Sequence, residues 1–304
     1  MLVLSDAEVR DALRWGDLIA AMEDALGGLS AGRVVQPLRS WLPLEEGKRF
    51  WGVMPAAAPH AMGIKLVSFD PRNAELDLPT VRATVVLFEP DTGEPLAVMD
   101  GSTLTAMRTA AVSAAVTKRL ARPDAQVLAL LGSGVQAASH LAALKHVRDF
   151  AEIRVWSRTA LHAERFAERY GARAMDAESA VRGADVVVTA TAAQTPILHG
   201  AWLERGAHVN AIGAPMPTWR ELDDEAMRNL VVVESRAAAA AESGDVILSG
   251  ASIHAEVGEI FAGTRSIAAA ETTIFKSVGV AIEDVAAARL VFDVVSARSG
   301  ERRP

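Results

Sequence analysis

The sequence predicts an α/β protein in which a doubly wound parallel sheet follows a smaller α+β domain. From residue 126 onward, short apolar segments alternate with segments of helical period, which is typical of parallel strands with helices on both faces. Residues 50–100 instead hold short segments rich in Val, Phe and Thr that Pro and Gly interrupt, which is typical of antiparallel strands. A chain of 304 residues is long enough for both domains.

In the first domain, residues 5–31 have helical period and start with Ser5, followed three residues later by Glu8, the pattern of a capping box. Strand-like segments follow at 50–56, 62–69, 80–90 and 95–100. The turn signal EPDTGEP separates the last two, which predicts an antiparallel hairpin. Ser102 then caps a helix that continues to about Leu120, because the proline of ARPDA disfavours helical backbone before it.

The second domain is expected to cover residues 121–279. Strands are predicted at 126–131, 153–157, 185–191, 208–212 and 230–234. Helices are predicted after the first strand to about Val147, and at 159–170, 176–182 and 237–241. The last segment, IEDVAAARLVFDVV, is amphipathic and is expected to pack back onto the first domain, which then comprises residues 1–120 and 280–304.

Composition excludes several classes of function. The net charge of −7 repels the backbone of a nucleic acid and an anionic membrane surface, so neither is an expected partner. The absence of cysteine excludes thiol catalysis, disulfides and zinc–thiolate sites, and the histidines show no His-x-x-x-His pair, so no metal is expected. Charged residues follow the first methionine too closely for a signal peptide and no apolar run reaches membrane-spanning length, so we expect a cytoplasmic protein.

The segment LALLGSGVQA places Gly132, Gly134 and Ala137 in the spacing Gly-x-Gly-x-x-Gly/Ala, between a predicted strand and a predicted helix. In a dinucleotide site the first glycine permits a tight turn and the second lets a pyrophosphate approach the backbone. The small third residue lets the helix lie close to the strand, with its free amide groups directed at the phosphates. The alternative is a turn of small residues that serves packing alone. The context favours a Rossmann dinucleotide-binding domain.

The end of the second predicted strand, VWSRTA, indicates which dinucleotide binds. An NAD site usually has an acid there for the ribose hydroxyls, whereas this chain has Ser157, Arg158 and Thr159. A guanidinium with two hydroxyl neighbours binds a 2′-phosphate through charge-assisted hydrogen bonds, which contribute about 1.5–3 kcal/mol each. We therefore expect NADP(H) as the preferred cofactor, with NAD(H) possible. The alternative is a solvated arginine at a strand end.

Three basic residues of the first domain are candidates for a pocket that binds a carboxylate. Lys65 lies among apolar residues of a predicted strand, on the same face as Gly63. Arg108 lies in LTAMRTAAVSAAV, where small neighbours allow close packing, and an enclosed guanidinium requires an anion. Arg39 is a third candidate in VVQPLRSWLP. The alternative for each is ordinary surface charge.

Together these segments resemble the ornithine cyclodeaminase/mu-crystallin family. The resemblance covers essentially the whole chain and is clearest in the stretches VVQPLRSWLP, GVMPA, IKLVSF, LFEPDTGEPLAVMDGSTLTAMRTAAVSAAVTK, LGSGVQA, VWSRT, SGDVILSGA and TTIFKSVGVAIEDVAAARLV. It implies a substrate-binding and dimerisation domain, completed by the C-terminal helix, and an NAD(P)-binding domain. Homodimers built through the first domain are expected.

The resemblance also implies roles for individual residues. Lys65 and Arg108 match the family's substrate-pocket lysine and arginine, with Lys65 and Arg108 as the candidate catalytic residues, and Arg39 matches a further arginine that faces the carboxylate. The pyrophosphate loop corresponds to Gly132, Ser133, Gly134, Val135 and Gln136, and the segment for the adenosine 2′-phosphate to Ser157, Arg158 and Thr159. Thr109 is expected to reach the cofactor phosphates, and Thr191 and Val278 to lie along the cofactor.

One departure from the family pattern decides between activities. Ornithine cyclodeaminases have an aspartate after Gly-Ala in the loop where this chain has Pro215, and the following PTWRELDDE is similar to the mu-crystallin branch, whose members act as ketimine reductases. Cyclodeamination moves several protons and needs a positioned base, whereas a protonated imine accepts hydride directly. We therefore expect NAD(P)H-dependent reduction of a small cyclic ketimine or 2-imino carboxylate, or the related amino-acid dehydrogenase reaction. The alternatives are an ornithine cyclodeaminase lyase and a non-catalytic protein that binds NADPH and a small ligand.

Overall fold

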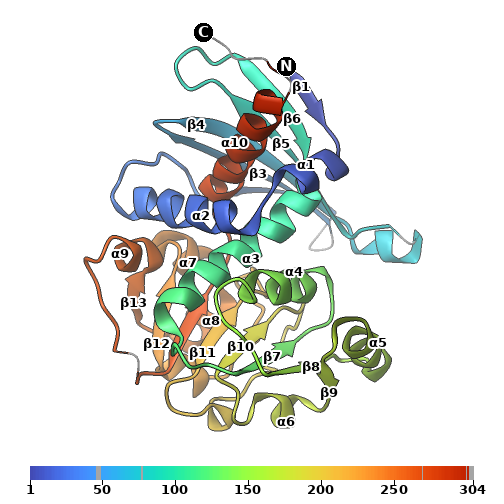
Figure 1. The fold of residues 1–304 in the computed structure, drawn as a ribbon, viewed down its shortest axis with the longest axis vertical. Helices are drawn as coiled ribbons and strands as arrows, with labels where there is room; N and C mark the ends of the chain where they lie inside the picture. Colours follow the sequence, from blue (N-terminus) through green and yellow to red (C-terminus); the bar gives the residue numbers. More distant parts are fainter. Residues whose placement is uncertain (46–48, 77, 269, 299, 301–304) are drawn as a thin grey trace. The chain divides into compact units, whose positions relative to one another are not determined.

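The computed structural model describes residues 1–45, 49–76, 78–268, 270–298 and 300. The chain forms two compact units (Figure 1): unit 1 consists of Met1–Arg108 with Val280–Pro304, and unit 2 of Thr109–Gly279. The two units divide after Arg108, within helix α3 (Gly101–Leu120), whereas the sequence predicted a division after residue 120, at the end of that helix. Residues 299 and 301–304 of the predicted C-terminal helix lie outside the described residues. The functional roles of the two units remain predictions.

Unit 1 is a mixed α+β unit with a six-stranded sheet in the order β1-β6-β5-β4-β3-β2. Its strands are β1 (Leu2–Leu4), β2 (Ser40–Glu45), β3 (Arg49–Ala58), β4 (Ala61–Phe69), β5 (Val81–Phe88) and β6 (Pro95–Asp100). Its helical segments are α1 (Asp6–Ala12), α2 (Trp15–Ser30), the 3₁₀ turn η1 (Pro71–Leu76) and α10 (Ala281–Arg298). Neighbouring strands are antiparallel except β1 and β6, which pair in parallel. The predicted hairpin is present as β5 and β6.

The predicted N-terminal helix is interrupted. The capping box is confirmed, because the Ser5 side chain accepts from the Glu8 backbone and the Glu8 carboxylate accepts from the Ser5 backbone. Leu13 and Arg14, however, have extended backbone, with ψ angles of 127° and 135°, and they separate α1 from α2. The apolar period continues across this break, and for that reason the sequence pattern predicts one helix.

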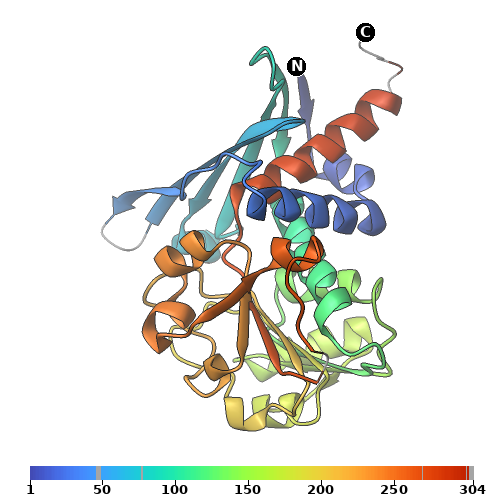
Figure 2. The ribbon, with the colours of Figure 1, turned by 90° about the vertical axis from the view of Figure 1, so that its left-hand side faces the viewer.

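Helix α10 packs on β3, β4 and β5 and against α2 (Figure 2). Alternate residues of β4 are buried, so Gly63 and Lys65 share the covered face, as the strand period predicts. At Gly63 a side chain would meet the helix, since a Cβ there would lie 2.8 Å from the Val86 carbonyl and 3.2 Å from Val285 of α10. Close approach of α10 therefore encloses Lys65.

Unit 2 is the predicted doubly wound domain. Its sheet has eight parallel strands in the order β13-β12-β14-β11-β10-β7-β8-β9. The strands are β7 (Val127–Leu131), β8 (Glu152–Trp156), β9 (Arg173–Ala174), β10 (Val186–Thr189), β11 (His208–Ala211), β12 (Leu230–Val233), β13 (Ile253–Glu256) and β14 (Thr273–Lys276). Besides part of α3, the helical segments are α4 (Val135–Leu144), α5 (Ala160–Tyr170), α6 (Ala177–Val181), η2 (Gly200–Trp202), η3 (Ala226–Arg228), α7 (Arg236–Glu242), α8 (Gly244–Ser249) and α9 (Val257–Phe261). The sequence did not predict β9, β13 or β14.

The strand order sets the place of a ligand site in unit 2. From β7 the chain goes to β8 on one side and later to β10 on the other side. In such sheets ligands bind outside the carboxyl ends of the strands where the order reverses. We call the residues that follow these strand ends the carboxyl edge of unit 2.

Among the described residues, no helix is long and apolar enough to cross a membrane.

The packing of α2 gives a test of the core of unit 1. Leu18 is fully buried in α2, so Leu18→Ala is expected to lower the free energy of unfolding by about 2–5 kcal/mol. The matched control is Leu161→Ala in α5, where the side chain is 49% exposed and a change within about 0.5 kcal/mol is expected. Urea unfolding measures both. Equal losses in the two variants would contradict the assignment of Leu18 to the core.

Candidate functional site

Two predicted cations of unit 1, Lys65 and Arg108, are buried and share one acidic partner. The Lys65 ammonium lies 2.6 Å from Oδ2 of Asp284, and Arg108 Nε donates to Oδ1 of the same carboxylate at 2.9 Å. Arg108 also forms an ion pair with Glu283, the neighbouring residue at the start of α10. We call Lys65, Arg108, Glu283 and Asp284 the charge cluster. Burial of both cations rules out the alternative of surface charge for them.

The cluster sets the protonation of its members. Burial lowers the pKa of Lys65 to about 8; Asp284 opposes this change, while the positive charges of Arg108 and Arg39 add to it. Burial by itself would raise the pKa of Asp284, but Arg108 and Lys65 outweigh it and hold that pKa below its ordinary value. A lysine with a pKa near 8 is mostly protonated at neutral pH and can still release a proton. It therefore has the properties of a general acid.

Arg39 lies near the cluster on the segment before β2. It is half-buried, and its guanidinium carbon lies 5.6 Å from the ring centroid of Trp41, within the range of a cation–π contact. Its positive charge contributes to the lowered pKa of Lys65, after burial and Arg108. The structure thus brings together the three cations that the sequence proposed. Their roles in substrate binding and catalysis remain predictions.

The two acids of the charge cluster were not predicted from the sequence. A ligand was expected as the anion beside Arg108, whereas Glu283 and Asp284 of the chain itself supply one. The available signal was a pair of acids in the first turn of a predicted helix, where a carboxylate is favoured by the helix dipole in any case. Nothing in that pattern specifies a partner that lies more than a hundred residues away in the sequence.

The glycine loop of unit 2 has the geometry that a pyrophosphate requires. Gly132 has a φ of 126°, and a Cβ there would lie 2.6 Å from the Ala190 carbonyl, so the turn after β7 excludes a side chain. Gly134 precedes α4, and a Cβ there would meet nothing within 4 Å. Open space at this position fits the close approach of a phosphate to the backbone. These residues fit a dinucleotide.

The other predicted residues of the loop surround this opening. The Ser133 hydroxyl donates to the Ser157 hydroxyl at 3.0 Å, which joins the loop to the end of β8. Val135 is 72% exposed although it is apolar. The side-chain oxygen of Gln136 is buried and accepts no hydrogen bond within the described part of the chain. Such a group is satisfied by a ligand donor or by water.

Arg158 and Thr159 lie just after the end of β8, beyond Ser157, and are both exposed. Ser157 is half-buried and contacts the loop through Ser133. The three residues therefore lie at the carboxyl edge beside the glycine loop, where the ribose of a dinucleotide binds in sheets of this kind. The arrangement is compatible with a 2′-phosphate bound by the guanidinium.

The remaining cofactor candidates are buried or engaged within unit 2. Thr109 is buried in α3. The Thr191 hydroxyl donates to Oε1 of Glu221 at 2.6 Å, so its side chain belongs to a buried network. Val278 is buried as well, and its amide donates to Glu234 at 3.2 Å.

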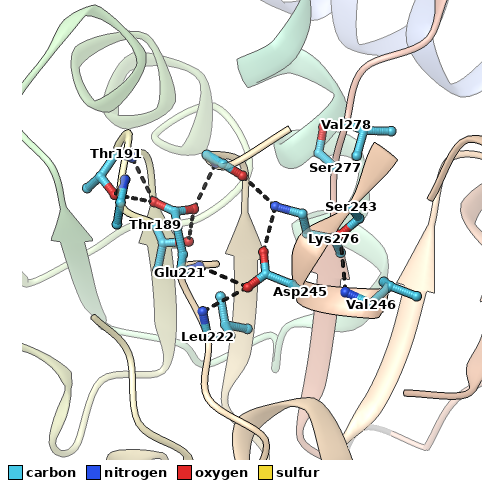
Figure 3. Close-up of polar contacts among 12 residues, drawn as sticks. Thr189, Thr191, Glu221, Leu222, Ser243, Asp245, Val246, Lys276, Ser277 and Val278 are labelled. Atoms are coloured by element: carbon cyan, nitrogen blue, oxygen red, sulfur yellow. Dashed lines mark hydrogen bonds and ion pairs between the residues drawn. The ribbon is translucent and has the colours of Figure 1, made fainter. Parts of the chain in front are cut away.

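The buried network of Glu221, Asp245 and Lys276 is shown in Figure 3. It contacts Gly213, the first residue of the loop 213–219, which follows β11 and holds no group that titrates near neutrality. Glu221 is fully buried and accepts four hydrogen bonds, from Thr189 Oγ1, from the amide and hydroxyl of Thr191, and from the Gly213 amide. Burial raises the pKa of Glu221, while the charge of Lys276 and the threonine hydroxyls oppose that rise. These donors hold the carboxylate in one position.

Lys276, the last residue of β14, completes the network. Its fully buried ammonium lies 2.9 Å from Asp245 Oδ2 and donates to the Gly213 carbonyl. Asp245 Oδ1 accepts from the amides of Glu221 and Leu222, each at 2.9 Å. Gly213 is therefore held at its amide by one buried charge and at its carbonyl by another. Glu221, Asp245 and Lys276 were not predicted from the sequence as parts of a site.

The fixed loop has a strained start. Ala214 has a φ of 54°, the left-handed region that side chains rarely adopt, and it is fully buried. A Cβ at Gly213 would lie 2.2 Å from the Thr191 carbonyl, so that position also requires glycine. Strain of this kind persists where the surroundings determine the backbone, as the network does here.

Comparison with known proteins gives consistent results over the whole chain. The sequence model of the ornithine cyclodeaminase/mu-crystallin family matches residues 1–299. The ketimine reductase mu-crystallin of Mus musculus is 48% identical over 300 residues, covering 95% of this chain and 96% of the mouse protein. The structure of a Thermococcus litoralis Delta(1)-pyrroline-2-carboxylate reductase with NADH and L-proline is similar at a TM-score of 0.92 and 34% identity, covering 99% of this chain and 98% of the other. An archaeal alanine dehydrogenase dimer with bound NAD is similar at a TM-score of 0.92 and 34% identity, covering 98% and 97%.

The buried network of unit 2 can be tested by removing its cation. Lys276→Met leaves the Asp245 carboxylate buried without its partner and is expected to lower the free energy of unfolding by about 3–5 kcal/mol. Adding Asp245→Asn should recover part of this loss, because the asparagine carbonyl can still accept from Glu221 and Leu222. Urea unfolding of both single variants and the double variant measures the coupling. Strictly additive losses would show that the two charges do not interact.

Proposed function

The chain belongs to the ornithine cyclodeaminase/mu-crystallin family, as its sequence predicts, and on this premise we propose that it is an NAD(P)H-dependent oxidoreductase that reduces the C=N bond of a small cyclic ketimine or 2-imino carboxylate. The observation that carries the proposal is the burial of Lys65 and Arg108 together in a chain whose relatives are named as reductases of such compounds. Direct amination of a 2-oxo acid is a close variant, supported by the similarity to an alanine dehydrogenase.

Residues at the carboxyl edge of unit 2 would hold the cofactor. The glycine loop from Gly132 to Gln136 would bind the pyrophosphate, and Ser157, Arg158 and Thr159 the 2′-phosphate of NADP(H). NAD(H) is the second candidate, because two similar structures contain NADH or NAD. When bound, the reduced nicotinamide supplies a hydride. Thr109 is proposed to reach the cofactor phosphates, and Thr191 and Val278 are proposed to lie along the bound cofactor.

Residues of unit 1 would hold the substrate. Arg108 and Arg39 would bind its carboxylate, since a guanidinium matches a carboxylate in shape and charge. Lys65 would donate a proton to the imine nitrogen, because its pKa of about 8 lets it be protonated at neutral pH and still act as an acid. Protonation leaves a positive iminium group whose carbon accepts hydride, so the reaction needs no further titratable group.

The loop after β11 distinguishes this reaction from cyclodeamination. Pro215 stands where cyclodeaminases of the family have an aspartate, and residues 213–219 contain no replacement acid or base. Glu221 is near the loop, but its carboxylate accepts four hydrogen bonds and is fully buried. Its role is therefore to hold the backbone of the loop at Gly213. This arrangement supports reduction of a preformed imine over a reaction that must move several protons.

We further propose that the protein is a cytoplasmic homodimer built through unit 1. The sheet of unit 1 exposes large apolar side chains on β2 and β3, namely Leu42, Leu44 and Trp51, with Leu42 directly opposite Trp51, and an exposed apolar patch favours association. One similar structure is an alanine dehydrogenase dimer. The chain has no cysteine and therefore does not need an oxidising compartment for disulfide formation, which is compatible with the cytoplasm.

The proposed reaction is tested by following the oxidation of NADPH with Δ1-piperideine-2-carboxylate and Δ1-pyrroline-2-carboxylate. We expect turnover by the wild type and a loss of roughly 100-fold or more in kcat/KM for Lys65→Ala and Arg108→Ala. The matched control is Arg82→Ala, which removes an exposed cation of β5. Ornithine with catalytic NAD should yield no ammonia. Absence of turnover with every cyclic imine and 2-oxo acid, despite tight NADPH binding, would favour the non-catalytic alternative.

Cofactor choice is tested at Arg158. We expect Arg158→Ala to weaken NADPH binding by roughly 10- to 100-fold, because one or two charge-assisted hydrogen bonds are lost. NADH binding should change little, since NADH has no 2′-phosphate. Titration of nicotinamide fluorescence gives both dissociation constants. An equal loss for the two cofactors, or none for NADPH, would contradict the role given to this arginine.

A further inference from the structure

We propose that Asp284 is a positioning residue of imine reduction: its single carboxylate holds the ammonium of Lys65 and the guanidinium of Arg108 at a fixed spacing, so that the proton donor and the carboxylate-binding group address the same substrate. This inference rests on the proposed function and deepens it. The Asp284 carboxylate is fully buried and is paired with both cations. It therefore acts through them and not by contact with the substrate.

The geometry divides the carboxylate between its two partners. Oδ2 of Asp284 lies 2.6 Å from Lys65 on β4, and Oδ1 accepts from Arg108 on α3 at 2.9 Å. Both side chains are no more than 5% exposed, and that of Asp284 is fully buried. Three separate elements of unit 1 therefore meet at one carboxyl group. A shift of that group would move both cations.

The start of α10 is fixed well enough to serve this purpose. The Ile282 amide donates to the Gln36 side chain at 2.9 Å, and the Val280 amide donates to Glu283 at 3.3 Å. Gly63 lets α10 approach β4 closely. Asp284 lies in the first turn of this 18-residue helix, where the helix dipole stabilises its negative charge. The carboxylate is thus held by the helix backbone and by its partners.

The two acids of the cluster have different tasks. Glu283 pairs with Arg108, whereas Asp284 pairs with both Arg108 and Lys65. Removing the charge of Glu283 should therefore affect mainly substrate binding by Arg108. Removing the charge of Asp284 should affect both binding and proton transfer. This difference between adjacent residues provides a control within the cluster.

The proton balance gives the expected pH dependence. Lys65 gives a proton to the imine nitrogen and becomes a neutral amine, the iminium carbon takes up hydride, and Lys65 regains a proton from water. The charged groups that face Lys65 are Asp284 from α10, Arg108 from α3 and Arg39 from the segment before β2. Among these groups of the described chain, Asp284 raises the pKa of Lys65, while burial and the two arginines lower it. Activity is lost as pH rises through this pKa, and without Asp284 the loss should occur at lower pH.

The experiment compares pH profiles of kcat and kcat/KM for the wild type and Asp284→Asn, from about pH 6 to about pH 10. We expect the alkaline limb of the kcat profile to move down by roughly one pH unit or more, and kcat/KM at neutral pH to fall roughly 10- to 100-fold. Glu283→Gln should raise KM and leave the alkaline limb in place. Asp293→Asn, an exposed residue of the same helix paired with Arg289, is the control and should match the wild type. The dissociation constant for NADPH should be unchanged in all of them, because the glycine loop lies in unit 2.

The outcomes separate this inference from the proposed function. If the wild type reduces no imine, the proposed function fails first. If the wild type turns over and Asp284→Asn keeps its kcat/KM and its alkaline limb, only the role of Asp284 is overturned. Should Asp284→Asn fail to fold, Asp284→Glu retains the charge and displaces it by one methylene group, and we expect a lower kcat with an unchanged alkaline limb. An unchanged kcat in Asp284→Glu would contradict the fixed spacing.

Discussion

A buried positive charge must be paired, and in unit 1 this requirement fixes where the last helix docks. Lys65 and Arg108 have left water, and neither could remain charged inside the unit without the carboxylates at the start of α10. Breaking such a buried pair strongly lowers the free energy of unfolding, so α10 has one favourable position on the sheet. The same contact keeps a lysine whose pKa is lowered to about 8 beside a guanidinium. Packing and proposed chemistry therefore depend on one set of ion pairs.

In unit 2, buried charges with partners hold the loop that follows β11. The segment after β11 has no titratable group of its own between residues 213 and 219, yet buried charged groups hold its first residue, Gly213. Glu221 holds the Gly213 amide, and Lys276 holds the Gly213 carbonyl with Asp245 as its counter-ion. A loop of this kind can shape a cofactor or substrate surface without exchanging protons. That property agrees with a reaction in which an iminium group accepts hydride.

The parts of the fold that sequence predicts are those set by neighbouring residues. Strand and helix periods located the doubly wound unit, and the spacing of Gly132 and Gly134 located the turn that a Cβ would block. The pattern failed where the decisive partner is distant. The residues around Lys65 in the sequence do not predict its contact with Asp284, and those around Gly213 do not predict its contact with Lys276. Strand β9 was missed because two residues show no period, and β13 because its sequence IHAE lacks the run of valines that marks β10 and β12. The break between α1 and α2 was missed because the apolar period continues through it.

The chain order of the two units has a consequence for biosynthesis. Unit 1 is split in the sequence, with the whole of unit 2 inserted between residue 108 and residue 280. A ribosome therefore completes the contiguous parallel-sheet unit before α10 has been made. Until α10 emerges, Lys65 and Arg108 lack their carboxylate partners, so the first sheet cannot bury them. The burial of Lys65 and Arg108 in unit 1 can therefore be completed only after the whole of unit 2 has been synthesised.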